Sequence, residues 1–208
     1  MFDKYLDWLI EVGTLSYNPE TECEEIFAIG PKDLDLAQRM IRAGTSDRKF
    51  MRQIMVSVDI TAPLYWWKEM DTYKVGTVAN STSTMHKLAT TPITIDCFET
   101  DDMTDVIIED SSEPTFIVSS GYAFNTYINW LEELRQRYNE VKDQKFWKEL
   151  IRLLPESWLQ TRTVTLNYEV LRNIYSQRKH HRLTEWHSFC TWIKELPYAG
   201  ELILYNLD

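Results

Sequence analysis

The chain has 208 residues, of which 44% are hydrophobic, and this is enough to bury one substantial core. Its formal net charge of −10 argues against general nucleic-acid binding, because a protein that neutralises many phosphates carries a basic face. No apolar run approaches the ~20 residues that cross a bilayer, and the acidic start lacks the lysines of a signal peptide, so we expect a soluble, cytoplasmic protein without a membrane partner.

The first part of the chain predicts two helices, then a strand and a third helix. Helical spacing of apolar residues indicates helices over 3–12 and 33–44, each closed by a glycine. Apolar and polar residues alternate over 50–63, which is the period of a strand with one buried face. A proline then permits a helix to begin, and helical spacing resumes over 64–74.

The middle of the chain carries weaker signals. Residues 76–96 are rich in Ser and Thr and poor in large apolar groups, which predicts a long loop. Residues 97–120 are acidic and ambiguous, with short strands indicated at 106–108 and 116–118.

The second half returns to strong periodic patterns. We expect helices over 123–141 and 144–154, a strand over 161–168, and helices over 168–178 and 183–196. The chain has no internal repeat and no linker long enough to separate two domains, so one domain over 1–208 is expected.

Several classes of enzyme lack their signatures in this sequence. There is no GxSxG elbow for a hydrolase, and neither GxGxxG nor GxxxxGK for a phosphate-binding loop. The histidines do not have the i, i+4 spacing of a metal pair, so we expect no metal. The three cysteines form no CxxC pair, and we expect them to be free thiols.

An otherwise acidic chain concentrates cations within residues 172–189. Such a cluster either faces water or receives an anion. Its members are Arg172, Arg178, Lys179, His180, His181 and Arg182.

Asn167, Asn173 and Arg178 lie on the predicted strand at 161–168 and the predicted helix at 168–178, and the last two fall within this stretch. Amide side chains suit the edge of a nucleobase or flavin ring, and a guanidinium suits phosphate. Asn167 is equally placed to cap the helix, and Arg178 to complement the dipole at the helix end. These local features leave both interpretations open.

The eight tryptophans also have two interpretations. Large indoles such as Trp66 and Trp67 pack cores and subunit interfaces, and they also stack on planar ligands.

The order of these features resembles the flavin-dependent thymidylate synthase family over most of the chain. The similar features are the strand QIMVSVDITAP running into a helix, a Ser/Thr loop, two helices, LLP, the strand TRTVTLN, a helix ending in QR and a closing helix with Glu-Trp. The resemblance implies an α+β fold with an antiparallel sheet flanked by helices, in which 92–120 is a variable insert. It also implies a homotetramer with sites shared between subunits, which uses FAD and methylenetetrahydrofolate to methylate dUMP.

The family's Arg-His-Arg signature is replaced here. By resemblance it falls on Thr72, Tyr73 and Lys74, and the following serine falls on Thr82. Lys74 and Thr82 are chemically close replacements and are the expected substrate-binding residues of this segment, although a lysine lacks the planar fork of arginine. The substrate-binding glutamine that precedes the signature becomes Glu69, which would repel a nucleotide phosphate.

The second half matches the family better. By resemblance Asn167 and Asn173 contact the flavin and Arg178 contacts the nucleotide, while an arginine of the family has become Glu169. We therefore expect the family fold with an altered or abolished reaction. Three functions remain open: a divergent thymidylate synthase, a flavin or nucleotide binder with other chemistry, and a non-catalytic accessory subunit.

Overall fold

The structure is a computed structural model that describes residues 29–81, 87–101, 103, 104, 106–110 and 116–207. The helix expected at 3–12 lies outside the described residues. The chain divides into two units, Met1–Leu36 and Ala37–Asp208. Its organisation as one domain stays a prediction.

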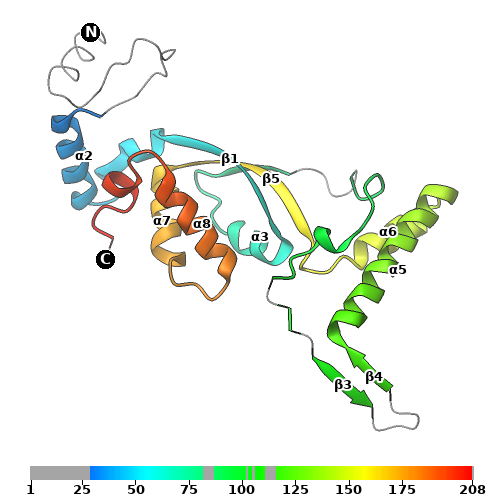
Figure 1. Ribbon diagram of the computed structural model, residues 1–208. Helices are drawn as coiled ribbons and strands as arrows, with labels where there is room; N and C mark the ends of the chain where they lie inside the picture. The colour runs from blue at the N-terminus through cyan, green and yellow to red at the C-terminus, as the bar shows by residue number, and fades with distance from the viewer. Residues whose placement is uncertain (1–28, 82–86, 102, 105, 111–115, 208) are drawn as a thin grey trace, which may run out of the picture. The chain divides into compact units, whose positions relative to one another are not determined.

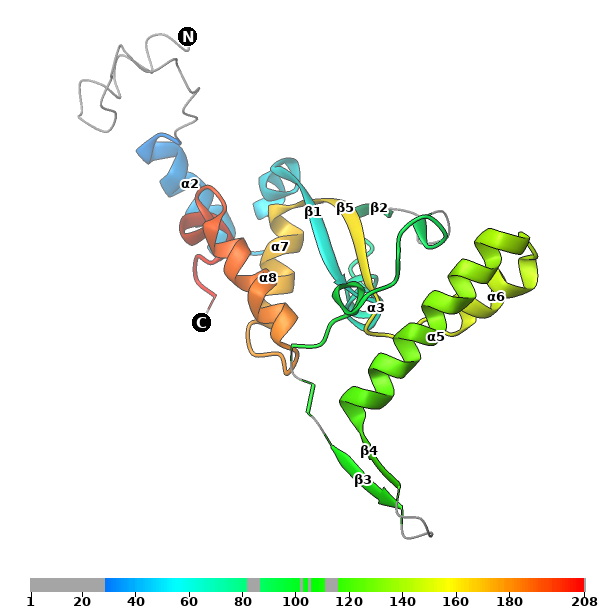
Figure 2. The same cartoon turned by 45° about the vertical axis from the view of Figure 1, so that its right-hand side comes forward.

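A three-stranded antiparallel sheet in the order β1-β5-β2 organises the second unit (Figures 1 and 2). Its strands are β1 (Met55–Pro63), β5 (Leu159–Asn167) and β2 (Val78–Ser81). The first residue of β1 pairs with the last of β5 and the last with the first, so the two strands pair along their whole length. The α+β fold class with an antiparallel sheet is confirmed.

Two local expectations around the sheet were wrong in part. The predicted strand at 50–63 starts only at Met55, because Arg48–Gln53 forms a 3-10 helix (η1). The predicted loop at 76–96 contains β2, whose four residues are all exposed. Strand β2 is held by its pairing with β5 and buries no face. Its sequence therefore shows no apolar period from which the strand could be predicted.

The two faces of the β1–β5 ladder differ in chemistry. Partners in register lie on the same face, so Val56 lies opposite Leu166 and Val58 opposite Val164, and both residues from β5 are fully buried. The other face is polar and carries three cross-strand hydrogen bonds, Ser57–Thr165, Thr163–Asp59 and Thr61–Thr161. The alternation predicted for this strand is therefore confirmed.

Helices α3 (Leu64–Met70), α7 (Tyr168–Arg178) and α8 (Thr184–Glu195) accompany the sheet, and α7 and α8 lie side by side (Figures 1 and 2). Trp66 and Trp67 are each 1% exposed and Trp186 is fully buried. The Trp66 ring centroid lies 4.9 Å from that of Trp67 and 4.7 Å from that of Trp186. These indoles are core residues.

Helix α3 is shorter than the predicted helix at 64–74. The N–H of Thr72 bonds to the carbonyl of Glu69 and that of Tyr73 to the carbonyl of Met70, so the chain turns after Met70 instead of continuing.

Helices α5 (Ser120–Val141) and α6 (Gln144–Arg152) pack against each other and confirm the helices expected at 123–141 and 144–154. Ser119 caps the start of α5 and Asp143 caps the start of α6. Seven buried side chains form their core, Leu88, Ile93, Phe98, Ile128, Leu131, Leu134 and Leu150.

Strands β3 (Ile107–Asp110) and β4 (Phe116–Ser119) form a two-stranded antiparallel sheet and confirm the short strands expected there. The remaining described helices are α2 (Pro31–Ala43), η2 (Ile95–Cys97) and a π-helix, η3 (Ala199–Ile203). None of the described helices is long and apolar enough to cross a membrane.

Candidate functional site

The structure divides the basic stretch at 172–189 between different places. Arg172 is only 5% exposed, and its Nη1 donates to the carbonyl oxygens of Ile203 at 2.9 Å and Tyr205 at 2.7 Å. This cation therefore holds the segment at the end of η3 and does not face an anion site. Arg178, in the last turn of the same helix, makes a different set of contacts.

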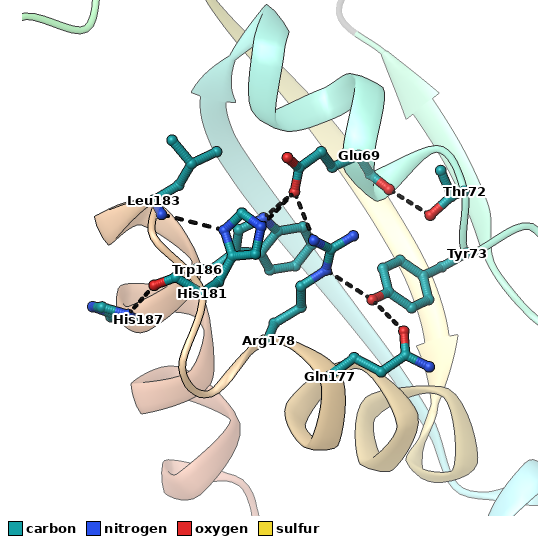
Figure 3. A network of polar contacts seen from close by, with 9 residues as sticks. All are labelled: Glu69, Thr72, Tyr73, Gln177, Arg178, His181, Leu183, Trp186 and His187. Carbon is teal, nitrogen blue, oxygen red and sulfur yellow. Dashed lines mark hydrogen bonds and ion pairs between the residues drawn. The ribbon is translucent and has the colours of Figure 1, made fainter.

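Arg178 meets Glu69 of α3 in a network of polar contacts (Figure 3). Arg178 Nη1 donates to Glu69 Oε2 over 2.9 Å, and the two side chains are 18% and 33% exposed. The topology brings them together, because α3 begins at one end of the β1–β5 ladder and α7 at the other. Helix α7 reverses the direction of β5 and returns its last turn to α3.

The same oxygen of Glu69 has two further neighbours. Trp186 Nε1 donates to it over 2.8 Å, and His181 Nε2 lies 3.5 Å away. His181 Nδ1 accepts a hydrogen bond from the backbone N–H of Leu183 at 3.2 Å, so the hydrogen of the neutral ring lies on Nε2, which faces Glu69. A guanidinium, an indole N–H and an imidazole N–H thus surround one carboxylate oxygen.

Neighbouring side chains also fix the guanidinium of Arg178. Its Nε donates to the hydroxyl of Tyr73 over 2.9 Å, and that hydroxyl donates to Gln177 Oε1 over 2.9 Å. The guanidinium carbon lies 4.8 Å from the ring centroid of Trp186 and 5.7 Å from that of Tyr73, within the range of cation–π attraction. The orientation of Arg178 is therefore set inside the protein before any ligand arrives.

Asn167, an expected flavin contact, is buried at 6% exposure and caps α7. Its Oδ1 accepts a hydrogen bond from Val170 N at 3.0 Å. Its Nδ2 lies against the backbone of Gly76, where an added Cβ would be 2.9 Å away. The amide oxygen of Asn167 is thus used as the cap of α7, and the role of this residue in flavin binding stays a prediction.

The other expected site residues lie on the surface or outside the described residues. Asn173 is exposed on α7, and its side chain forms no hydrogen bond with the described part of the chain. Lys74 is exposed and lines a cavity of about 140 Å³ together with Trp67 and Tyr73. Thr82 lies outside the described residues. Of the four expected site residues that the structure describes, only Arg178 belongs to the network around Glu69.

Two replacements of family residues have taken structural roles. The hydroxyl of Thr72, at the first signature position, donates to the carbonyl oxygen of Glu69 over 2.7 Å. Glu169 accepts from Arg48 Nε over 2.8 Å, and these side chains are only 8% and 14% exposed. The second pair joins α7 to η1 in the part of the structure where the resemblance placed an arginine.

The sequence identified Glu69 as unfavourable for a phosphate but missed its role as the partner of Arg178. It also missed His181, Trp186 and Tyr73 as members of the network. The signal was present in part, since Glu69 and Arg178 both fall on substrate-binding positions of the resembled family. Two opposite charges placed at one site predict that they pair with each other.

No protein-family model and no curated protein matches the chain. Among solved structures, flavin-dependent thymidylate synthase ThyX from Helicobacter pylori, complexed with FAD and dUMP, is 17% identical with a TM-score of 0.56, and the match covers 85% of this chain and 83% of that one. The UMP/dUMP methylase PolB from Streptomyces cacaoi, bound with 5-Br UMP, is 14% identical with a TM-score of 0.55 over 86% of this chain and 84% of that one.

Proposed function

We propose that this chain, which has the fold of the flavin-dependent thymidylate synthases, is a divergent relative that has lost the reductive methylation of dUMP and serves as a non-catalytic subunit. The observation that carries this proposal is the pairing of Arg178 with Glu69. The arginine expected to receive the nucleotide phosphate already binds a carboxylate of the same chain.

A phosphate approaching Arg178 has to displace Glu69 or accept its proximity. Two like charges 4 Å apart repel by about 1 kcal/mol in water and about 4 kcal/mol at an effective dielectric constant of 20. Because each 1.4 kcal/mol is tenfold in affinity, even the lower figure weakens dUMP binding several-fold. Glu69 is also stabilised by Trp186 and His181, so moving it away breaks further contacts.

Weak flavin binding has separate support. Asn167 already uses its amide oxygen to cap α7, and Asn173 is exposed on the same helix. FAD, when bound, supplies the hydride for the methylation, and the Arg-His-Arg signature of the resembled family is replaced in this chain by Thr72, Tyr73 and Lys74. We therefore propose that FAD binding is weak or absent and that methylenetetrahydrofolate is not a substrate.

Purified full-length protein and a genetic assay test the loss of activity. We expect a colourless protein whose visible spectrum shows no flavin bands after incubation with FAD and gel filtration. We also expect no growth when the gene is expressed in thymidine-requiring bacteria, with Helicobacter pylori ThyX as the positive control. A protein that retains flavin and restores growth would show that the enzyme is active and overturn the proposal.

A cytoplasmic homotetramer remains the expected assembly, because the resemblance implies a tetramer and the solved neighbours share the fold. Light scattering coupled to gel filtration measures the mass of the particle in solution. Four copies of the 24.7 kDa chain are expected, and a monomer at micromolar concentration would contradict this assembly.

A further inference from the structure

The second unit contains a cavity of about 600 Å³ whose walls include neither Glu69 nor Arg178. The walls come from the second half of β1, the start of α3, residues 99–101 with Met103, and one side of α8. Because neither residue of the Glu69–Arg178 pair lines this cavity, a ligand bound here is independent of the proposed function.

One wall of the cavity is the free edge of a strand. Within the described part of the chain β1 pairs with β5 alone, and its residues 58–63 line the cavity. Across the described residues, no backbone hydrogen bond joins 55–63 to a segment other than β5. An edge strand presents a row of unpaired N–H and C=O groups, which another extended chain can pair with.

The cavity wall is also strongly acidic. It contains no Lys, Arg or His, but it contains four carboxylates, Asp59, Glu99, Asp101 and Glu185. None of the four forms an ion pair with a described residue. Their hydrogen-bond donors are two hydroxyl groups and one backbone N–H, which leave the negative charge uncompensated. This wall therefore favours a cationic ligand.

Aromatic side chains supply the rest of the surface. Four aromatic residues line the cavity, Tyr65, Trp66, Phe189 and Trp192. The ring centroids of Phe189 and Trp192 lie 5.2 Å apart. Aromatic faces attract the heads of Lys and Arg side chains and cover their apolar stems. Trp66 is 1% exposed, and its Nε1–H has no acceptor among the described residues. A carbonyl group from an entering chain would supply the missing acceptor.

We propose that this cavity binds an extended, basic peptide segment of a partner protein, which adds to the free edge of β1 as a further strand. Residues 58–63 span about 20 Å at strand spacing and can pair with a segment of similar length. The pairing gives affinity through the backbone, and alternate Lys or Arg side chains meet the carboxylates and the aromatic rings.

Two other occupants fit the same features less well. A second copy of this chain pairing through the same edge would bring its own four carboxylates opposite these ones. A small polyamine would satisfy the charge and could donate to backbone carbonyls, but it has no acceptor for the N–H groups along β1. The peptide alone uses the edge, the charge and the aromatic surface together.

Synthetic hexapeptides test this site by fluorescence anisotropy with full-length protein. The probe is a labelled peptide of alternating Lys and Val, compared with alternating Glu and Val and with an N-methylated Lys-Val peptide that lacks backbone donors. We expect the Lys-Val peptide to bind at least tenfold more tightly than either, and its affinity to fall as salt screens the carboxylates. Spermidine should compete only weakly.

Charge variants locate the binding. The double variant Glu99→Gln with Glu185→Gln should weaken the Lys-Val peptide at least tenfold, whereas Glu195→Gln, a carboxylate of α8 outside the cavity wall, should leave it unchanged. Equal effects of both changes, equal binding of the N-methylated peptide, or full competition by spermidine would each overturn the proposal. Peptide-induced dimers would overturn the proposal in favour of a second copy of the chain.

The variant Glu69→Gln should leave the affinity for the Lys-Val peptide unchanged. A failure of the peptide proposal can therefore be distinguished from a failure of the proposed function.

Discussion

Arg172 Nη1 donates to the carbonyl oxygen of Tyr205 over 2.7 Å, which links the middle of α7 to the segment after η3. The same atom donates to Ile203, and burial lowers the pKa of this guanidinium. Arg172→Ala leaves buried carbonyls without a donor, so we expect a loss of about 2 to 4 kcal/mol in the free energy of unfolding. Urea unfolding measures it, with the exposed Arg152→Ala as the control. Equal stability of the two variants would contradict a stabilising role for the hydrogen bonds of Arg172.

The close approach of Gly76 to the cap of α7 leads to a second prediction. Gly76 has φ of +77°, and an added Cβ would lie 2.9 Å from Asn167 Nδ2 and 3.2 Å from Val170 Cγ2. Gly76→Ala combines an unfavourable backbone conformation with a clash, and it should destabilise the protein by about 1 to 3 kcal/mol. Gly200→Ala is the matched control, because nothing lies within 4 Å of its added Cβ. Thermal unfolding of the two variants should separate them clearly, and similar melting temperatures would refute the contact.

Glu132 predicts a pH dependence of stability. Its pKa is lowered from 4.5 to about 2, mainly by hydrogen bonds from Arg135, with a further contribution from the backbone N–H of Ile93. Because the folded pKa lies below the unfolded one, the stabilisation is complete above pH 4.5 and is lost as the pH falls toward 2.

Glu132→Gln tests this dependence. The variant should be less stable than the original protein at pH 7, and the difference should shrink between pH 5 and 2. Urea unfolding at a series of pH values measures both curves. Glu133→Gln, which removes an exposed pair with Arg137, should leave the slope unchanged. A constant gap between the Glu132→Gln and original curves would rule out this source of acid sensitivity.

Periodicity predicted most of the elements because one face of each is buried. The alternation of residues 55–63 matches a strand whose apolar face includes Val58 and whose polar face includes Asp59. The order of elements identified the fold of the flavin-dependent thymidylate synthases, and the solved neighbours confirm it. Local chemistry also predicted Asn167 as a helix cap, one of two open interpretations.

Contacts between distant residues escaped the sequence for a physical reason. Glu69 and Arg178 are 109 positions apart, and their pairing depends on α7 returning along the sheet. Arg172 looked like a member of a basic patch, but the helix turns it into the protein interior. Strand β2 has no periodic signal, because its exposed residues depend on β5 for their hydrogen bonds. The roles of Asn167, Asn173, Lys74, Thr82 and Arg178 in ligand binding stay predictions.

Titration of dUMP into the original protein and into Glu69→Gln tests the central claim most directly. Glutamine keeps the shape and the acceptor of Glu69 but removes the charge, so calorimetry should find dUMP bound at least tenfold more tightly by Glu69→Gln than by the original protein. Glu156→Gln, which removes an exposed carboxylate paired with Lys68, should behave like the original protein. Equal affinity of Glu69→Gln and the original protein for dUMP, whether strong or undetectable, would contradict the claim that Glu69 keeps dUMP from binding to Arg178.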